Sequence, residues 1–214
     1  VSVYIASKEE ISAEALIPLV EKLGVQRLEL PPAVASLFAA FARKSPSQMK
    51  ELASVRQLSW AGEALPLASM NALSLLFGPD VILRSIYGAT EASSNLISSV
   101  RVGDVPNLTG FPLGRVGDDP FVRFRKVEDL AGLNLIEFTG PVAAGYLGAS
   151  EEAQTKFSEA PNGSRWWTSG DLVHIDEADD IWHKGRIDDV IKISGKLSSP
   201  LEPTLALLAI DGIT

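Results

Sequence analysis

Strand-like and helix-like runs alternate through the first hundred residues, and this alternation limits the fold more than any other feature. The strand-like runs, rich in β-branched and aromatic residues, are "VSVYIAS", "VQRLEL", "VRQLSWAG" and "DVILRSIYG". Between them, apolar residues recur at helical spacing in "SAEALIPLVEKLG", "PPAVASLFAAFARK" and "PLASMNALSLLF", the first with Ser12 as a cap and Gly24 as a stop. Such alternation is typical of a largely parallel sheet covered by helices on both faces.

Beyond about residue 100 the pattern changes to short apolar runs separated by Gly, Pro and Asp, such as "FVRFR", "LNLIEFTG", "DLVHID" and "DIWHKG". This pattern predicts a β-rich region, either a small barrel or a distorted sheet. We therefore expect an α/β subdomain at 1–102, a barrel-like β subdomain at 103–185, and a hinge with the beginning of a small C-terminal domain at 186–214.

Charge and cysteine content exclude several classes of function. The formal net charge of −8 argues against binding a nucleic-acid backbone or an anionic membrane, so a small ligand is favoured. The absence of cysteine excludes disulfides, thiolate metal ligands and thiol nucleophiles, and it fits a cytoplasmic location. We expect no membrane anchor, because no run reaches about 20 apolar residues, and no signal peptide, because the N-terminus lacks a basic stretch followed by an apolar core.

The segment "YGATE" lies at the carboxyl end of a predicted strand, where α/β proteins usually bind ligands. There the Tyr87 ring can stack on a base, and Gly88 lets the backbone approach a ligand. Thr90 offers a hydroxyl to phosphate oxygens, and the Glu91 carboxylate can hold Mg²⁺. The alternative is that Tyr87 and Gly88 form only a turn, and that Thr90 and Glu91 cap a following helix.

Two later segments also carry candidate ligand-binding side chains. In "TSGDLV", Asp171 either accepts hydrogen bonds from a ribose diol or belongs to a polar turn. In "GRIDDVIKISG", Arg186 either reaches a phosphate or sugar or lies on an exposed hairpin. His174 and His183 lack the spacing of a zinc site and are interpreted as structural. Packing in the core or barrel is predicted for three tryptophans, Trp166, Trp167 and Trp182.

The order of five segments resembles that of the adenylate-forming (AMP-binding, ANL) superfamily. These segments are "WAGEALP", "YGATE", "GPVAAGYLG", "WTSGDL" and "GRIDDVIKISG". The run "VQRLELPPAVASLFAAF" leading into "VRQLSWAGEALP" is most similar to adenylation domains of nonribosomal peptide synthetases, while acyl or aryl acid ligases stay open. The resemblance implies that a carboxylic acid, by preference an amino acid, attacks the α-phosphate of ATP to give an acyl-adenylate and pyrophosphate. The acyl group would then pass to a thiol of CoA or of a carrier-protein phosphopantetheine.

The resemblance also implies roles for individual residues, with ATP or AMP and Mg²⁺ as cofactors. In the implied catalytic set, Thr90 contacts the α-phosphate, Glu91 holds Mg²⁺ and Asp188 is the pivot of a domain rotation. The nucleotide set borders the adenine or contacts the ribose and phosphate, and it comprises Gly62, Glu63, Ala64, Tyr87, Gly88, Asp171 and Arg186. By position relative to the motifs, the acid pocket is expected to be lined by Ser59, Ala61, Ile86, Ser94 and Asn95.

The sequence departs from the family pattern in several places. It contains no glycine-rich and hydroxyl-rich loop with a lysine for the β- and γ-phosphates, which the resemblance places before residue 1. The catalytic lysine is expected beyond Thr214, so neither Lys192 nor Lys196 takes its role. We therefore expect this chain to be one part of a ligase, inactive alone and completed by the remainder of the adenylation domain. Ser169 replaces a usual threonine and keeps its hydroxyl.

Two details concern the turn before "DIWHKG" and the end of the chain. Asp179 stands where a turn glycine is usual, and aspartate tolerates that conformation better than most residues. The run "SGKLSSPLEP" differs from the family pattern. This difference leaves open a non-catalytic adenylation-like module that docks a partner protein. A third interpretation, an unrelated α/β ligand-binding protein, has to explain five ordered motifs as accidents.

Overall fold

The computed structural model describes residues 3–7, 11–44, 52–62, 65–107, 110–148, 150–193, 196–200 and 203. The chain divides into two compact units. The first unit comprises Val1–Tyr87 and Ile97–Phe111, and the second comprises Gly88–Leu96 and Pro112–Thr214.

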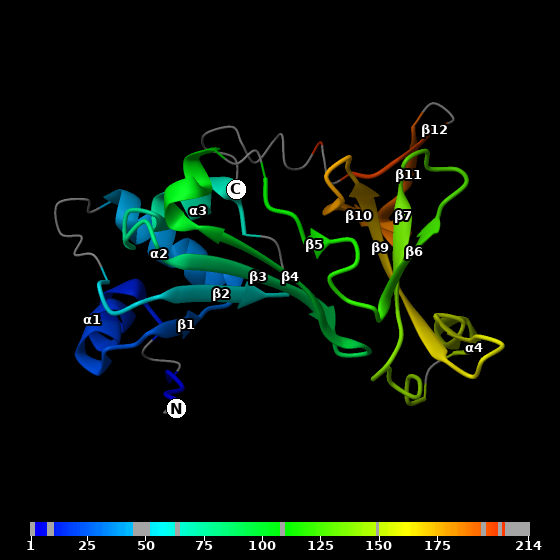
Figure 1. Ribbon diagram of the computed structural model, residues 1–214, viewed down its shortest axis with the longest axis horizontal. Coiled ribbons are helices and arrows are strands. Elements are labelled where there is room, and N and C mark those ends of the chain that lie inside the picture. Colours follow the sequence, from blue (N-terminus) through cyan, green and yellow to red (C-terminus); the bar gives the residue numbers. More distant parts are fainter. Residues whose placement is uncertain are drawn as a thin grey trace. The chain divides into compact units, whose positions relative to one another are not determined.

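A four-stranded sheet forms the centre of the first unit (Figure 1). Its strands lie in the order β1 (Arg27–Glu29), β2 (Gln57–Ala61), β3 (Ile82–Ala89) and β4 (Ser93–Arg101). The first three strands are parallel, as the alternating pattern predicted. A short turn at Thr90–Ala92 then returns the chain beside β3, and the tip of this hairpin belongs to the second unit.

Helices α1 (Ala13–Leu23), α2 (Pro32–Lys44) and α3 (Leu67–Leu73) alternate with these strands, and the 3-10 helix η3 (Val102–Asn107) follows β4. The predicted caps of α1 are confirmed: the Ser12 side chain accepts a hydrogen bond from the Ala15 backbone N–H, and Gly24 adopts φ 61°. Apolar faces of α2 and α3 meet the strands in one core cluster, where Phe38, Leu58 and Leu83 are fully buried. Each such side chain stabilises the fold by about 1.5–3 kcal/mol through its removal from water.

A curved antiparallel sheet dominates the second unit (Figure 1). Its path runs β5 (Gly114–Arg115), β10 (Asp180–Arg186), β9 (Arg165–Ile175), β7 (Asn134–Phe138) and β6 (Val122–Lys126), and β8 (Phe157–Glu159) also pairs with β9. The remaining elements are α4 (Glu151–Gln154), η4 (Ile187–Asp189), β11 (Ile191–Ile193) and β12 (Lys196–Ser198). The predicted class, an α/β region followed by a β-rich one, is confirmed, and the β-rich region is a curled half-barrel sheet.

The N-terminal segment departs from the prediction. Residues 3–7 of the expected strand "VSVYIAS" are not in a strand, and Val3 and Ile5 are more than four-fifths exposed. Local β-propensity is satisfied only where a neighbouring strand pairs with the segment, and the described sheet pairs β1 with β2 alone. Most of the predicted tail helix in 201–212 lies outside the described residues.

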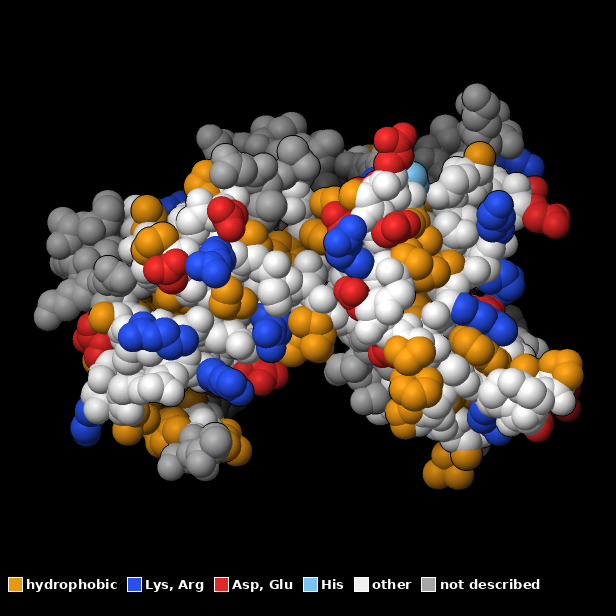
Figure 2. Space-filling model, viewed as in Figure 1, with side chains coloured by type: hydrophobic (Ala, Val, Ile, Leu, Met, Phe, Trp, Pro, Cys, Tyr) orange, Lys and Arg blue, Asp and Glu red, His pale blue; other side chains and the backbone are white. Residues whose placement is uncertain are grey.

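Two further observations concern the described residues only. None of their helices has both the length and the apolar content that a membrane crossing requires. On the face drawn in Figure 2, the described acidic and basic side chains are interspersed. That face therefore presents no large field of a single sign.

Candidate functional site

Two irregularities in the second unit's sheet meet at one place. From the Leu135–Leu172 pair to the Glu137–Thr168 pair, β7 advances two residues while β9 advances four. On the other side of β9, the pairing with β10 shifts between His183 and Arg186. Bulges of this kind re-aim side chains and are common beside active sites. The bulged part of β9 is the predicted segment Ser169–Asp171.

Ser169 and Gly170 shape the bulge. The Ser169 hydroxyl donates to the Ile136 carbonyl at 3.2 Å and accepts from the Asp171 backbone N–H at 3.0 Å. Gly170 has φ +82°, and a Cβ added there would lie 3.1 Å from Nη2 of Arg186. Glycine therefore avoids backbone strain at position 170, and a larger residue would also require the Arg186 guanidinium to shift. The hydroxyl that Ser169 retains positions the backbone that carries Asp171.

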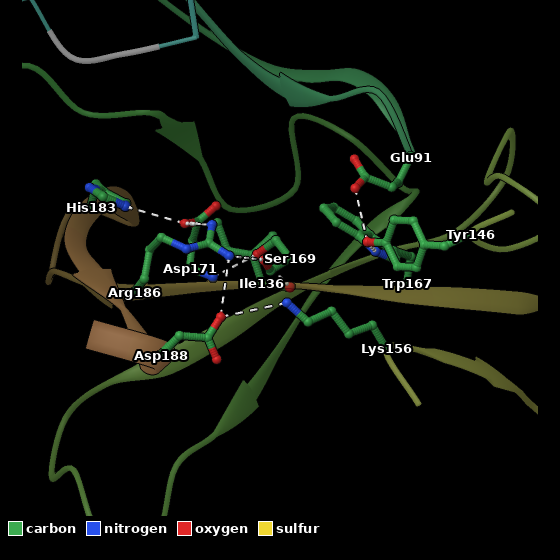
Figure 3. Close-up of polar contacts among 10 residues, drawn as sticks. All are labelled: Glu91, Ile136, Tyr146, Lys156, Trp167, Ser169, Asp171, His183, Arg186 and Asp188. Atoms are coloured by element: carbon green, nitrogen blue, oxygen red, sulfur yellow. Dashed lines mark hydrogen bonds and ion pairs between the residues drawn. The ribbon is translucent and has the colours of Figure 1, made fainter. Parts of the chain in front are cut away.

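The Asp171 carboxylate lies between two basic side chains of β10 (Figure 3). Its Oδ1 is 3.0 Å from Arg186 Nη1 and 3.6 Å from His183 Nε2, and the side chain is 15% exposed. Arg186 Nη2 also donates to the Ser169 carbonyl at 3.2 Å and lies 3.5 Å from Asp188 Oδ2, which Lys156 Nζ also approaches at 3.5 Å. The structure thus brings together the predicted Asp171, Arg186 and Asp188.

This group offers complementary chemistry to a polar ligand. An ionised carboxylate only accepts hydrogen bonds, so it suits a pair of sugar hydroxyls. A guanidinium presents a planar set of donors that suits phosphate or carboxylate oxygens. His183, which the sequence assigned to no ligand, adds a ring nitrogen beside the carboxylate of Asp171.

A second polar group centres on Glu91, in the turn between β3 and β4. The Tyr146 hydroxyl donates to Glu91 Oε1 at 2.9 Å, and the Trp167 indole N–H donates to the Tyr146 oxygen at 3.1 Å (Figure 3). The helix-cap alternative for Thr90 and Glu91 is wrong, because the chain after them pairs with β3 as a strand. The turn alternative at 87–88 is also wrong, because both residues lie within β3.

The environment of Tyr146 keeps its phenol protonated. Burial raises its pKa above the ordinary value of 10.0, the Trp167 hydrogen bond opposes this effect, and the nearby Glu91 carboxylate raises the pKa further. The phenol therefore remains a hydrogen-bond donor at neutral pH. No role was predicted for Tyr146, although its segment "GPVAAGYLG" is one of the five ordered motifs. Trp167 is buried and stacks on Phe138, so the packing predicted for it is confirmed.

A buried carboxylate supports the bulge from β7. Glu137 accepts hydrogen bonds from Nε of Arg123 and Nε of Arg125, each at 2.7 Å, and from the Thr168 hydroxyl at 3.1 Å. Burial raises the pKa of Glu137, but the two arginines lower it by more, so the net pKa is below its ordinary value. Because Thr168 directly precedes the bulge, Glu137 fixes the strand where Ser169 and Asp171 begin to diverge from regular pairing.

The predicted acid-pocket residues of the first unit lie within β2 and β3. Ser59 and Ala61 alternate along β2 and so share one face, and Ala61 is in register with Ile86. The Ser59 hydroxyl is buried and accepts from the Gln57 side chain at 2.7 Å. Gly62 follows with φ +92°. The remaining predicted positions, Glu63 and Ala64 and the side chains of Ser94 and Asn95, lie outside the described residues.

The described residues contain no cluster of three or more His, Cys, Asp or Glu side chains able to enclose a metal ion. Mg²⁺ rarely needs such a cage, because it is usually bound by one or two carboxylates together with phosphates and waters. A carboxylate has about four lone-pair positions, so the Tyr146 hydrogen bond leaves Glu91 with acceptor capacity. The donor chemistry of Glu91 therefore fits the predicted magnesium role.

No protein-family model matches the chain. It is 31% identical over 198 residues to the NRPS-like tryptophan epimerase fscC of Fusarium equiseti, covering 86% of this chain and 13% of that protein. It is 32% identical over 185 residues to the 4-hydroxybenzoate–CoA/benzoate–CoA ligase of Rhodopseudomonas palustris, covering 83% and 32%. This chain belongs to the adenylate-forming superfamily.

Two solved structures share its fold. IdnL7 superposes with a TM-score of 0.73 at 22% identity, covering 96% of this chain and 40% of IdnL7. The anthranilate CoA ligase AuaEII, solved with anthranoyl-AMP, gives a TM-score of 0.70 at 23% identity, covering 98% and 38%. The chain spans about a third or less of the length of the curated relatives named here.

Proposed function

We propose that this chain supplies the adenylate-binding part of a ligase that activates a carboxylic acid, by preference an amino acid, as an acyl-adenylate. The observation that carries the proposal is the position of Asp171 on the paired bulges, beside Arg186 and His183. In this proposal the Asp171 carboxylate accepts hydrogen bonds from the ribose hydroxyls of ATP or AMP. Arg186 contacts the ribose or a phosphate, and Asp188 at η4 serves as the pivot of a domain rotation.

The remaining assignments come from the family resemblance. Glu91 would hold Mg²⁺, which when bound neutralises charge on the transferring phosphate, and Thr90 would contact the α-phosphate. Tyr87 and Gly88 would lie against the adenine together with Gly62, Glu63 and Ala64. The acid would meet Ser59, Ala61 and Ile86, with Ser94 and Asn95. Their mixture of small, polar and aliphatic side chains would suit an acid with a modest, not fully apolar side chain.

The thiol acceptor is proposed by class. One relative is named a benzoate–CoA ligase, and another, 29% identical over 174 residues, is the ligase for L-proline and the L-prolyl-carrier protein of Streptomyces coelicolor. We therefore propose either CoA or the phosphopantetheine of a carrier protein as acceptor. The cytoplasmic location expected from the sequence agrees with the presence of ATP and both acceptors in that compartment.

The test is calorimetric titration of the 214-residue chain with AMP and with a non-hydrolysable acyl-adenylate analogue. Asp171→Asn removes the charge and one acceptor, and Asp129→Asn makes the same change at an exposed carboxylate of the same unit. We expect saturable binding by the wild type and by Asp129→Asn. Asp171→Asn should bind at least about tenfold more weakly, as expected from losing one hydrogen bond to a charged group. A folded wild type that gives no heat with either ligand would contradict the proposal.

A further inference from the structure

The segment around Tyr146 contacts Glu91 through both backbone and side chain. The Ala143 backbone N–H donates to the Glu91 carbonyl at 2.7 Å, and the Tyr146 hydroxyl donates to Glu91 Oε1 at 2.9 Å. These two contacts join a loop to a hairpin turn 55 residues earlier in the chain. They fix the backbone of residue 91 and one oxygen of its carboxylate at the same time.

Tyr146 is itself firmly held. Its backbone N–H donates to Gln154 Oε1 at 3.4 Å, and its carbonyl accepts from Gln154 Nε2 at 2.6 Å. Its ring lies edge-on to Phe157 with centroids 5.2 Å apart. The phenol oxygen is therefore placed by contacts that do not involve Glu91.

Trp167 determines the direction of the Tyr146 hydroxyl proton. An indole N–H can only donate, so the Tyr146 oxygen must accept from it and direct its own proton elsewhere. The acceptor in that direction is Glu91 Oε1, as Figure 3 shows. Because Trp167 is buried and stacked on Phe138, this orientation is maintained by the core of the second unit.

We propose that Tyr146 is a positioning residue that holds the Glu91 carboxylate in the orientation needed to receive a metal–nucleotide complex. The inference rests on the proposed function, because Glu91 acts in the reaction only if the chain binds such a complex. A freely rotating carboxylate loses side-chain entropy when it binds a ligand, and this loss weakens binding. Because Tyr146 already orders the Glu91 carboxylate, that entropy is lost before the ligand binds. Trp167 acts through Tyr146 and does not contact the ligand.

The informative variant is Tyr146→Phe. It removes the hydroxyl but keeps the ring that packs against Phe157 and the backbone groups that bind Gln154. The matched control is Thr139→Val, which removes a hydroxyl in the same unit that donates to the Arg165 carbonyl at 2.6 Å. If the Tyr146 hydroxyl were purely structural, Tyr146→Phe and Thr139→Val should have the same effect on the gain in nucleotide affinity from Mg²⁺.

The first test needs neither metal nor nucleotide. The indole N–H resonance of Trp167 is followed by NMR in the wild type, Glu91→Gln, Tyr146→Phe and the double variant. Charge on Glu91 polarises the Tyr146 hydroxyl and so strengthens its acceptance from Trp167. We expect Glu91→Gln to shift the Trp167 resonance when Tyr146 is present and to leave it unchanged in the Tyr146→Phe background. Equal shifts in both backgrounds would overturn the inference.

The second test measures the metal-dependent part of nucleotide affinity. The chain is titrated with α,β-methylene-ATP in Mg²⁺ and again in EDTA. We expect Tyr146→Phe to reduce the gain from Mg²⁺ by about tenfold, as for loss of a hydrogen bond to a charged group, and to leave the affinity in EDTA unchanged. Thr139→Val should retain the full gain.

The outcomes separate this inference from the proposed function. An unchanged Mg²⁺ gain in Tyr146→Phe would overturn the inference while leaving nucleotide binding intact. If the wild type binds no nucleotide in either buffer, the proposed function fails, and the Trp167 resonances still decide whether Tyr146 positions Glu91.

Discussion

Replacing Glu137 by Gln should destabilise the second unit by about 2–3 kcal/mol at neutral pH. The Glu137 side chain is 5% exposed and accepts two charge-assisted hydrogen bonds at 2.7 Å and a third from Thr168. A hydrogen bond to a charged group contributes about 1.5–3 kcal/mol, but Arg123 and Arg125 are half-exposed, so solvent screening reduces each value. The amide keeps one carbonyl acceptor and turns an N–H group toward a guanidinium.

The effect should depend on pH in a defined direction. The arginines hold the pKa of Glu137 below its ordinary value of 4.5, despite the opposing effect of burial. As pH falls, the unfolded state therefore takes up a proton before the folded state does. The stabilisation is complete well above pH 4.5 and is lost as pH falls through the lowered pKa. Glu137→Gln cannot titrate, so the difference from wild type should shrink in acid.

The assay is urea unfolding followed by tryptophan fluorescence, since Trp166, Trp167 and Trp182 all lie in the second unit. The control, Glu159→Gln, changes an exposed carboxylate of β8. A loss below about 0.5 kcal/mol, the usual range for surface substitutions, would refute the reasoning. So would a difference between Glu137→Gln and wild type that stays constant from neutral pH into acid.

Three further predictions concern stability. Gly170→Ala should lower the free energy of unfolding by about 1–3 kcal/mol, because φ is +82° at this position. The loss should exceed that of Gly163→Ala, since the new methyl group lies 3.1 Å from Arg186 Nη2 at position 170 and has no neighbour within 4 Å at position 163. Equal midpoints of the two variants in thermal unfolding would contradict this. Ser12→Ala should lower stability in urea by about 1 kcal/mol through loss of the α1 cap, and an unchanged midpoint would show that the cap is dispensable. Leu83→Ala should cost about 2–5 kcal/mol, since Leu83 is fully buried, and a loss below 1 kcal/mol would mean that the core collapses around it.

Local features of the fold were predictable because they depend on neighbours in sequence. Ser12 caps α1 through a backbone group three residues away, and Gly24 ends it in the left-handed conformation. Asp179 adopts φ 64°, as its place in a turn suggested. By contrast, the segment 3–7 carries a good strand pattern but no strand. Whether such a segment pairs is decided by distant residues that a local pattern does not contain.

The sequence motifs named candidate residues for the site, but they could not show which contacts support those residues. The ordered motifs identified Glu91, Asp171 and Arg186, and the structure places the last two 3.0 Å apart. The motifs could not show that Asp171 lies on a bulge, because the bulge arises from two shifted registers with other strands. They also gave no role to Tyr146, whose partner Glu91 lies 55 residues away.

The central claim is that the Asp171 carboxylate binds the ribose hydroxyls of a nucleotide, and a ligand–protein cycle tests it most directly. The affinities of AMP and 2′-deoxy-AMP are measured for the wild type and for Asp171→Asn. We predict that removing the 2′-hydroxyl weakens wild-type binding by about tenfold, as expected for one hydrogen bond to a charged group, and weakens Asp171→Asn much less. Equal losses in both proteins would show that Asp171 does not contact the ribose, and would contradict the account.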